Sequence, residues 1–95
     1  MSVMYIVVKH EIRDAKSFFD KGATMVQSLP EGVHAHLFLP DKAMTSAVCL
    51  WEADSVGTVK SVVEKELGRF SRNDYYELDG AKASGLERLG LATTR

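Results

Sequence analysis

Two histidines on one predicted strand have the clearest potential for chemistry. His34 and His36 are two residues apart in the stretch VHAHLFLPDKAMTSAVCLWEA, residues 33–53. On a strand this spacing puts both imidazoles on one face, about 7 Å apart at the backbone. Such a pair can bind an anionic small molecule, shuttle a proton or hold a metal ion. It can equally be a packed, hydrogen-bonded pair without a ligand, which we expect for either residue alone.

A metal site is the weakest of these alternatives. Zinc sites usually have at least three protein ligands. The third histidine, His10, falls on a predicted strand that does not neighbour the strand of His34 and His36. We therefore predict no metal and no cofactor.

Five further side chains are candidates for lining a ligand pocket with the two histidines: Tyr5, Lys9, Glu52, Tyr75 and Tyr76. Lys9 and Glu52 are expected on sheet faces turned away from the helices. Adjacent residues of a strand point to opposite faces, so one of the two C-terminal tyrosines should face the helices. The sequence contains no Ser-His-Asp order, phosphate loop, CxxC or HExxH, so catalytic residues stay unassigned.

Cys49 and Trp51, each the only residue of its kind, share one face of a predicted strand. A nucleophilic cysteine needs a cationic neighbour or a helix N-terminus. The sequence places neither beside Cys49, in the middle of its strand. We expect both side chains to pack in the core and Cys49 to react slowly with thiol reagents.

The length and charge of the chain indicate one small domain, residues 1–95, with a core of about residues 4–78 and a tail of residues 79–95. The net charge of -1 and the lack of a Lys/Arg cluster argue against nucleic-acid binding. No apolar run is long enough for a membrane span or a signal peptide. A single cysteine fits a reducing compartment, and we expect a cytoplasmic protein.

The first half of the chain predicts a strand and a helix. Residues 4–12 alternate as a strand whose more apolar face should meet the helices. Asp14 is a good N-cap for a helix over residues 15–29. Its buried stripe is predicted to comprise Ala15, Phe18, Phe19, Gly22, Val26 and Leu29. We expect the mid-helix Gly22 to allow close approach to the sheet.

Residues 33–53 predict a hairpin in which both faces are apolar. The helix side of its first strand should carry Val33, Ala35, Leu37 and Leu39, and the other side His34, His36 and Phe38. An antiparallel sheet with one face in water alternates more cleanly between apolar and polar residues. Both faces of this sheet should therefore be covered at least in part.

The second half predicts a further helix and strand. Asp54 or Ser55 should cap a helix that ends at Gly68. Residues 69–74 form a polar link, and residues 75–78 a short strand. In the tail, residues 81–84 are expected to make a helical turn, and residues 92–95 to be disordered.

The resulting order is strand, helix, strand, strand, helix, strand, which is the ferredoxin-like βαββαβ pattern of an α+β protein. Right-handed crossovers put both helices on one face of a four-stranded antiparallel sheet, with the first and third strands in the middle. The other face is apolar and needs a partner. A second copy of the chain is the simplest one, so we predict a homodimer.

In element order and in the segment VHAHLFLPDKAMTSAVCLWEAD, the chain resembles the dimeric α+β barrel superfamily, and in particular small bacterial members of unknown function. The resemblance implies a homodimer with sheets packed face to face. It also implies a range of activities: cofactor-independent oxygenases, isomerases, and proteins that bind haem or a metal. Haem-binding relatives offer a histidine outside the central sheet, whereas every histidine here falls on a predicted strand.

Three functions therefore stay open. The first is a homodimer that binds a small molecule in a cleft, with or without oxygenase or isomerase activity. The second is a non-enzymatic sensor or interaction module, and the third a metal- or haem-binding protein. The sequence does not decide whether the chain is an enzyme.

Overall fold

The structure, a computed structural model, describes residues 3–91 and contains the six elements in the expected order. These elements are β1 (Met4–Ile12), α1 (Ala15–Met25), β2 (His34–Pro40), β3 (Ser46–Ala53), α2 (Val56–Leu67) and β4 (Ser71–Glu77). Short 3₁₀ helices follow at Val26–Ser28 and Leu86–Leu89. The predicted disorder of residues 92–95 lies outside the described residues.

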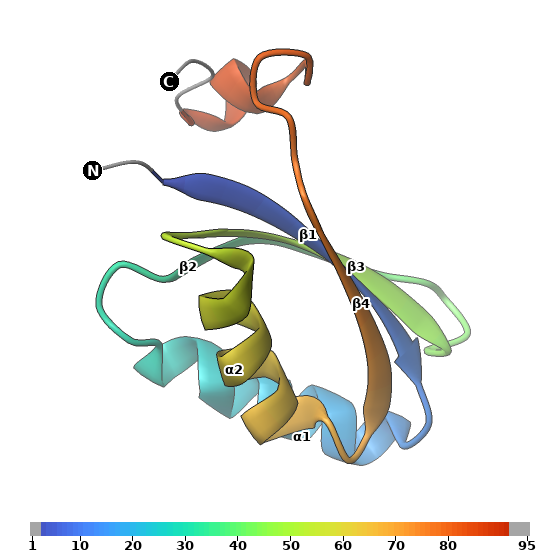
Figure 1. Cartoon of the computed structure of the whole chain (residues 1–95). Helices are drawn as coiled ribbons and strands as arrows, with labels where there is room; N and C mark the ends of the chain where they lie inside the picture. Colours follow the sequence, from blue (N-terminus) through green and yellow to red (C-terminus); the bar gives the residue numbers. More distant parts are fainter. Residues whose placement is uncertain (1–2, 92–95) are drawn as a thin grey trace.

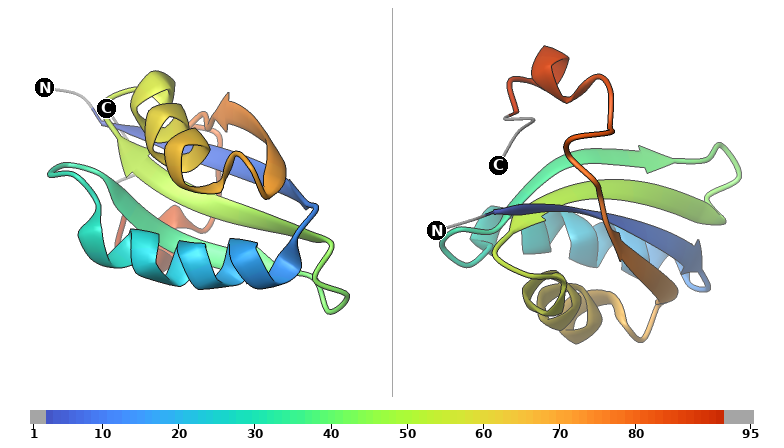
Figure 2. Two further views of the ribbon diagram at one scale, coloured as in Figure 1. Left: turned by 90° about the horizontal axis from the view of Figure 1, so that it is seen from below. Right: turned by 45° about the horizontal axis from the view of Figure 1, so that its top comes forward.

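The four strands form one antiparallel sheet in the order β2-β3-β1-β4. Both helices lie side by side on one face, and the C-terminal tail lies on the other (Figures 1 and 2). This is the ferredoxin-like α+β fold, as the sequence predicts, with β1 and β3 in the middle. Within residues 3–91, no helix has the length and apolarity needed to cross a bilayer.

Helix α1 begins as predicted but ends earlier. The Asp14 carboxylate accepts a hydrogen bond from the Ser17 backbone N–H and caps the helix. After Met25 the chain tightens into a 3₁₀ turn, which rotates the residues that follow. As a result Met25 is buried in the core and Val26 is half exposed, the reverse of the predicted stripe.

Helix α2 follows its predicted pattern closely. Ser55 caps it by accepting from the Thr58 N–H, and its buried side chains are Val59, Val63 and Leu67. At its end, a Cβ added to Gly68 would lie 2.6 Å from the Glu64 carbonyl oxygen. Only glycine therefore fits this position.

A β-bulge in β2 changes which side chains face the helices. Ala35 pairs with Trp51, but the next pair is Leu37 with Leu50, so His36 is an extra residue. The bulge reverses the alternation beyond it. Phe38 packs against Phe18 and Phe19 on the helix side, while Leu37 joins the outer cluster described below. The predicted faces of Leu37, Phe38 and Leu39 are therefore wrong, and those of Val33 to His36 are correct.

Strand β4 is longer than expected. It begins at Ser71 in the segment predicted as a polar link, and Ser71 pairs with Ile12 at the far end of β1. The residues Ser-Arg-Asn-Asp have low strand propensity. Backbone pairing with the edge of β1 outweighs that preference here.

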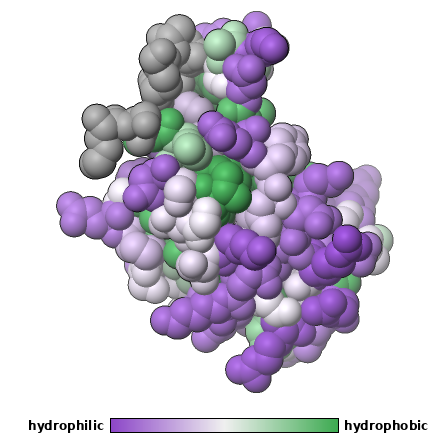
Figure 3. Space-filling model, in the orientation of Figure 1, coloured by the Kyte–Doolittle hydropathy of each residue, from purple (hydrophilic) through white to green (hydrophobic). Residues whose placement is uncertain are grey.

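The tail covers part of the outer face of the sheet. Leu86 is buried against three outer-face residues of the two central strands, Tyr5, Val7 and Leu50. Gly85 and Gly90, both at positive φ, bracket the 3₁₀ turn that holds Leu86 in place. On the face shown in Figure 3, hydrophobic residues gather where the tail leaves the sheet, and hydrophilic residues cover most of the rest of that face. The turn predicted at residues 81–84 lies slightly earlier, beginning at Asp79.

The β2–β3 loop contains one strained residue, Met44, an exposed side chain with φ of 60°. A left-handed conformation costs a non-glycine residue about 1–2 kcal/mol. Met44→Gly should therefore raise the free energy of unfolding by up to about 1 kcal/mol, once the extra entropy of the unfolded glycine is subtracted. Urea titration of both proteins measures this. Ala43→Gly, at the neighbouring position, should destabilise, and a gain there equal to that of Met44→Gly would contradict the explanation.

Candidate functional site

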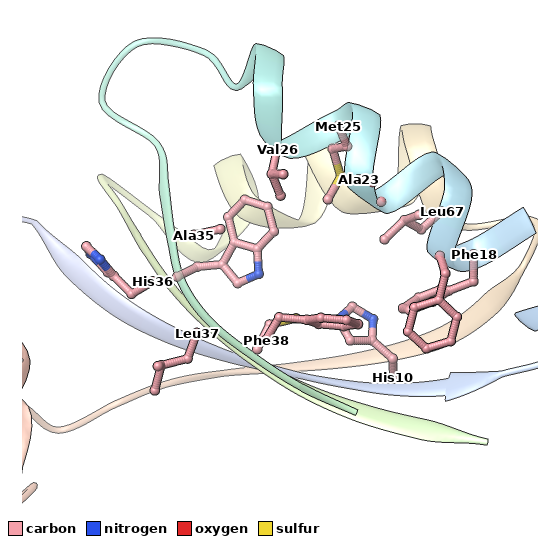
Figure 4. Close-up of a pocket in the computed structure, with 14 residues that line it drawn as sticks. His10, Phe18, Ala23, Met25, Val26, Ala35, His36, Leu37, Phe38 and Leu67 are labelled. Carbon is pink, nitrogen blue, oxygen red and sulfur yellow. The ribbon is translucent and has the colours of Figure 1, made fainter. Parts of the chain in front are cut away.

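A pocket of about 430 Å³ lies between α1 and the sheet. Its volume is in the range of small-molecule sites. The walls are mainly apolar and aromatic, formed by Phe18, Phe19, Met25, Phe38, Trp51 and Leu67. The polar side chains of His10 and Cys49 also line it, and Figure 4 shows His10 and Phe38 together on the sheet side, opposite Met25 and Ala23 of α1.

Gly22 keeps space open in the helix wall of this pocket. A Cβ at this position would meet no heavy atom within 4 Å. The prediction that Gly22 lets the helix approach the sheet closely is therefore wrong. The residue borders the pocket, where a larger side chain would have room to enter it.

Trp51 brings an unused hydrogen-bond donor to the pocket. The residue is 1% exposed, and its indole Nε1 finds no hydrogen-bond partner within residues 3–91. A buried polar group without a partner costs about 1–3 kcal/mol. A bound molecule with an acceptor atom would remove that cost.

His10 links Cys49 to Asn73 across the two central strands and β4. His10 Nε2 lies 3.1 Å from Cys49 Sγ, and His10 Nδ1 lies 2.6 Å from Asn73 Oδ1. The sheet register explains both contacts. Asn73 of β4 pairs directly with His10 of β1. Cys49 of β3 pairs with Val8, which is the helix-facing residue just before His10 on β1.

The hydrogen bonds of Asn73 fix the tautomer of His10. Asn73 Nδ2 donates to the Glu64 carboxylate at 2.9 Å, and Ser71 Oγ donates to Asn73 Oδ1 at 2.8 Å. Asn73 therefore presents an acceptor to His10, so Nδ1 carries the proton. Nε2 of the neutral ring is then free to accept the Cys49 S–H.

Burial controls the protonation of this group. It lowers the pKa of His10 below its ordinary value of 6.5, against smaller raising effects from the Asn73 hydrogen bond and the Glu64 charge. Burial also raises the pKa of the Cys49 thiol to about 12, against a smaller lowering by the nearby Trp51 indole N–H, which does not reach hydrogen-bond geometry with any group in residues 3–91. At neutral pH the resting pair is therefore a neutral imidazole and a thiol.

Four of the predicted site residues come together on the outer face. His36 Nε2 lies 2.8 Å from Glu52 Oε1, and its ring centroid is 6.1 Å from that of His34 and 6.3 Å from that of Tyr5. The His36 side chain points away from the pocket between α1 and the sheet (Figure 4). Because His36 stands at the bulge of β2, the residue still borders that pocket although its ring points away from it. The expectation that both histidines point away from the helices is correct.

The remaining predicted residues are spread more widely. Lys9 and Tyr76 lie further along the outer face, as their pairing with Val48 and Val7 shows. Tyr75 lies on the helix side, where its hydroxyl donates to Glu64 at 2.5 Å. Burial, then this hydrogen bond, raises the pKa of Tyr75. Across residues 3–91, no group of three or more His, Cys, Asp and Glu side chains is placed to hold a metal ion.

His10 should make stability depend on pH. Because its folded pKa is lowered, the unfolded chain binds the proton more readily. The free energy of unfolding should therefore fall as the pH drops below about 6.5 and keep falling until the folded-state pKa is passed. Urea titrations at pH 7, 6 and 5 test this, with His10→Gln as the comparison. An equal decrease in both proteins would contradict it.

The pairing of His10 with Cys49 was missed in the sequence. Alternation along the first and third strands places both residues at helix-facing positions, and these two strands are predicted neighbours, so the sequence does contain the signal. From the sequence alone, we consider His10 only as a possible third metal ligand for His34 and His36. The apolar pocket itself has no signature in the sequence.

The comparisons with known proteins agree with the fold. The sequence matches no family model and no curated protein. The structure is similar to that of a putative antibiotic biosynthesis monooxygenase from Nitrosomonas europaea, with 10% identity, a TM-score of 0.58 and coverage of 86% of this chain and 94% of that one. It is also similar to an uncharacterized protein from Thermotoga maritima, with 11% identity, a TM-score of 0.54 and coverage of 81% and 99%. These likenesses confirm the predicted ferredoxin-like α+β fold of the chain.

Proposed function

We propose that this chain binds a small, largely aromatic molecule with a hydrogen-bond acceptor in the pocket between α1 and the sheet. The single observation that carries the proposal is the buried Trp51 Nε1–H, which has no hydrogen-bond partner within residues 3–91 and lies in a mainly apolar wall. Apolar pockets with a few placed polar groups are the usual form of small-molecule sites. The aromatic side chains would hold the ring system, and the indole N–H would hold the acceptor.

A matched pair of probes tests the acceptor requirement. 2-Acetonaphthone has a carbonyl oxygen and 2-ethylnaphthalene has none, while the two are alike in size. Titration followed by protein NMR should show tighter binding of 2-acetonaphthone, with shifts at the Trp51 indole and at residues of α1. Equal affinity for the two compounds, or shifts confined to the outer face, would contradict the proposal.

The pocket can be closed from Gly22. Gly22→Leu should place a side chain in the cavity and weaken 2-acetonaphthone binding at least about tenfold, which is about 1.4 kcal/mol. Gly22→Ala is the matched control, because a methyl group takes little space and stabilises a helix interior by about 1 kcal/mol over glycine. Thermal melting checks that both variants fold. Unchanged affinity in a folded Gly22→Leu protein would place the ligand elsewhere.

Oxygenation of the bound molecule is the second candidate function. It is supported by the likeness in fold to the solved structure named as a putative monooxygenase, and by the neutral imidazole of His10 in the pocket wall, which could take a proton from a phenol. Incubation with 1-naphthol under air, with an oxygen electrode, tests it. Consumption lost in His10→Gln supports the oxygenase, and binding without consumption favours a non-enzymatic sensor.

We also infer that two copies pair through the outer face. Leu39, Val48 and Tyr76 are exposed there beside the tail, and Leu39 and Val48 are cross-strand neighbours. Such a face is commonly closed by a two-fold partner. Light scattering should give twice the chain mass, and Val48→Glu should give the monomer. Lys60→Glu, at an exposed position of α2 on the opposite face of the sheet, should leave the mass unchanged, and a wild-type monomer would contradict the pairing.

A further inference from the structure

Cys49, His10 and Asn73 form a hydrogen-bonded series in the order that activates a nucleophile. The two contacts, at 3.1 and 2.6 Å, join a thiol to an imidazole and the imidazole to a side-chain acceptor. A nucleophile, a base and a group that orients the base are the recurring parts of thiol and hydroxyl catalysis. The sequence predicts Cys49 only as a packed, slowly reacting core residue, but the contact with His10 gives it a base. We propose that Cys49 is a nucleophile that accepts an acyl group from a small aromatic ester or thioester, with His10 as its base.

This inference rests on the proposed function, because the acyl donor has to enter the same pocket. Both Cys49 and His10 line that pocket, so the sulfur faces space that a ligand can occupy. A second observation, separate from the Cys49–His10 contact, is Trp51, which lines the same cavity and whose indole N–H has no hydrogen-bond partner among the described residues. A donor near a nucleophile can stabilise the oxygen of an attacked carbonyl group.

Acyl transfer to Cys49 needs no oxidant or reductant. Cys49 Sγ attacks the carbonyl carbon while its proton passes to His10 Nε2, and the carbonyl oxygen becomes an oxyanion that accepts from Trp51 Nε1–H. The bond from the carbonyl carbon to the leaving oxygen or sulfur then breaks, and the His10 imidazolium gives its proton to the departing alkoxide, phenolate or thiolate or to solvent. Water, deprotonated by His10, next hydrolyses the thioester, and the proton returns to the sulfur.

Burial keeps both groups neutral at rest, so the proton has to be transferred during the attack itself. His10 is 3% exposed and neutral, with Nε2 free to accept. Cys49 is a thiol at rest, so its proton has to leave as the bond to carbon forms. Asn73 is a positioning residue, because it holds the His10 Nδ1–H and so keeps Nε2 turned to the sulfur.

The test uses 4-nitrophenyl benzoate and the whole chain. Cys49 is the only cysteine, so a benzoyl thioester can form at one position only. Intact mass and peptide mapping should show benzoylation at Cys49, with release of one equivalent of 4-nitrophenolate in the first turnover. His10→Gln should slow this step at least about a hundredfold, the usual contribution of a general base. His34→Gln, outside the pocket, should react at the wild-type rate.

A second pair of variants separates positioning from folding. Asn73→Asp, combined with Glu64→Gln so that no second carboxylate faces it, keeps an acceptor for His10 Nδ1–H and should retain the acylation rate. Asn73→Leu, combined with the same Glu64→Gln, removes the acceptor and should lose that rate. Thermal melting is measured for every variant, and this pair decides the question if His10→Gln does not fold. Equal rates in all folded variants, or benzoylation only at lysines, would overturn the proposal.

Binding of 2-acetonaphthone, measured on the same protein, separates this inference from the proposed function. Binding with no benzoylation of Cys49 would overturn the nucleophile and leave the binding pocket standing. If the protein neither binds 2-acetonaphthone nor becomes benzoylated at Cys49, both the nucleophile and the binding pocket are overturned.

Discussion

Replacing Trp51 by phenylalanine should weaken the binding of 2-acetonaphthone about tenfold and leave the chain folded. The substitution keeps an aromatic ring in the core but removes the N–H. In the free protein that N–H has no partner in residues 3–91, so its removal partly offsets the loss of packing volume. The affinity for 2-ethylnaphthalene should change little. Calorimetric titration of both probes measures the difference.

Trp51→Ala is the matched comparison. Trp51 is one of the largest fully buried side chains, and truncation of such a ring costs about 3–5 kcal/mol of the free energy of unfolding. That is a large part of the stability of a domain of this size. A Trp51→Phe protein as unstable as Trp51→Ala, or one that binds 2-acetonaphthone as tightly as the wild type, would contradict the assigned role of the indole N–H.

Leu86→Asp should destabilise the chain by about 3 kcal/mol or more. Leu86 is 5% exposed and holds the tail on Tyr5, Val7 and Leu50. The substitution loses about 1.5–3 kcal/mol of apolar burial, and it adds a carboxylate that has to be desolvated or expelled. Because expulsion would bare apolar residues of the sheet, the variant should also aggregate more readily. Urea titration and light scattering measure the two effects.

Leu89→Asp provides the control in the same 3₁₀ turn. Leu89 is 48% exposed, so a charge there stays in water and should change the free energy of unfolding by less than about 0.5 kcal/mol. Equal effects at the two positions would mean that the tail is not anchored by Leu86.

The element order and the helix starts could be predicted because their signals are local. Asp14 and Ser55 stand before apolar stripes with helical spacing, and each caps its helix. Alternation along β1 separated the helix-facing residues from the outer ones correctly. Such patterns depend on short stretches of chain, which a sequence shows directly.

The bulge at His36 could not be predicted in the same way. Strict alternation predicts an apolar helix-facing side for β2 that includes Leu37. The inserted residue His36 instead turns Leu37 outward and Phe38 toward the helices. The start of β4 at Ser71 depends likewise on backbone pairing with β1, and the polar residues there carry no strand signal. Both features arise from the match between neighbouring strands.

The candidate site was predictable in part. His34, His36, Tyr5 and Glu52 do gather on the outer face, whereas the pocket lies on the helix face. Its volume depends on how far α1 stands from the sheet, which no residue pattern encodes. Predicting the His10–Cys49 contact requires two predictions to be combined, the order of the strands and the face on which each residue lies. The sequence supports each of these predictions separately.

The position of Trp51 gives the chain an optical reporter of its own pocket. It is the only tryptophan, and it is buried in the wall that Cys49 shares. An indole in apolar surroundings emits at shorter wavelength than one in water, and a nearby thiol quenches the emission. A ligand that accepts from the indole N–H, or an acyl group on the sulfur, alters both properties. Fluorescence of the unlabelled protein should therefore follow occupation of the pocket and modification of Cys49 in real time.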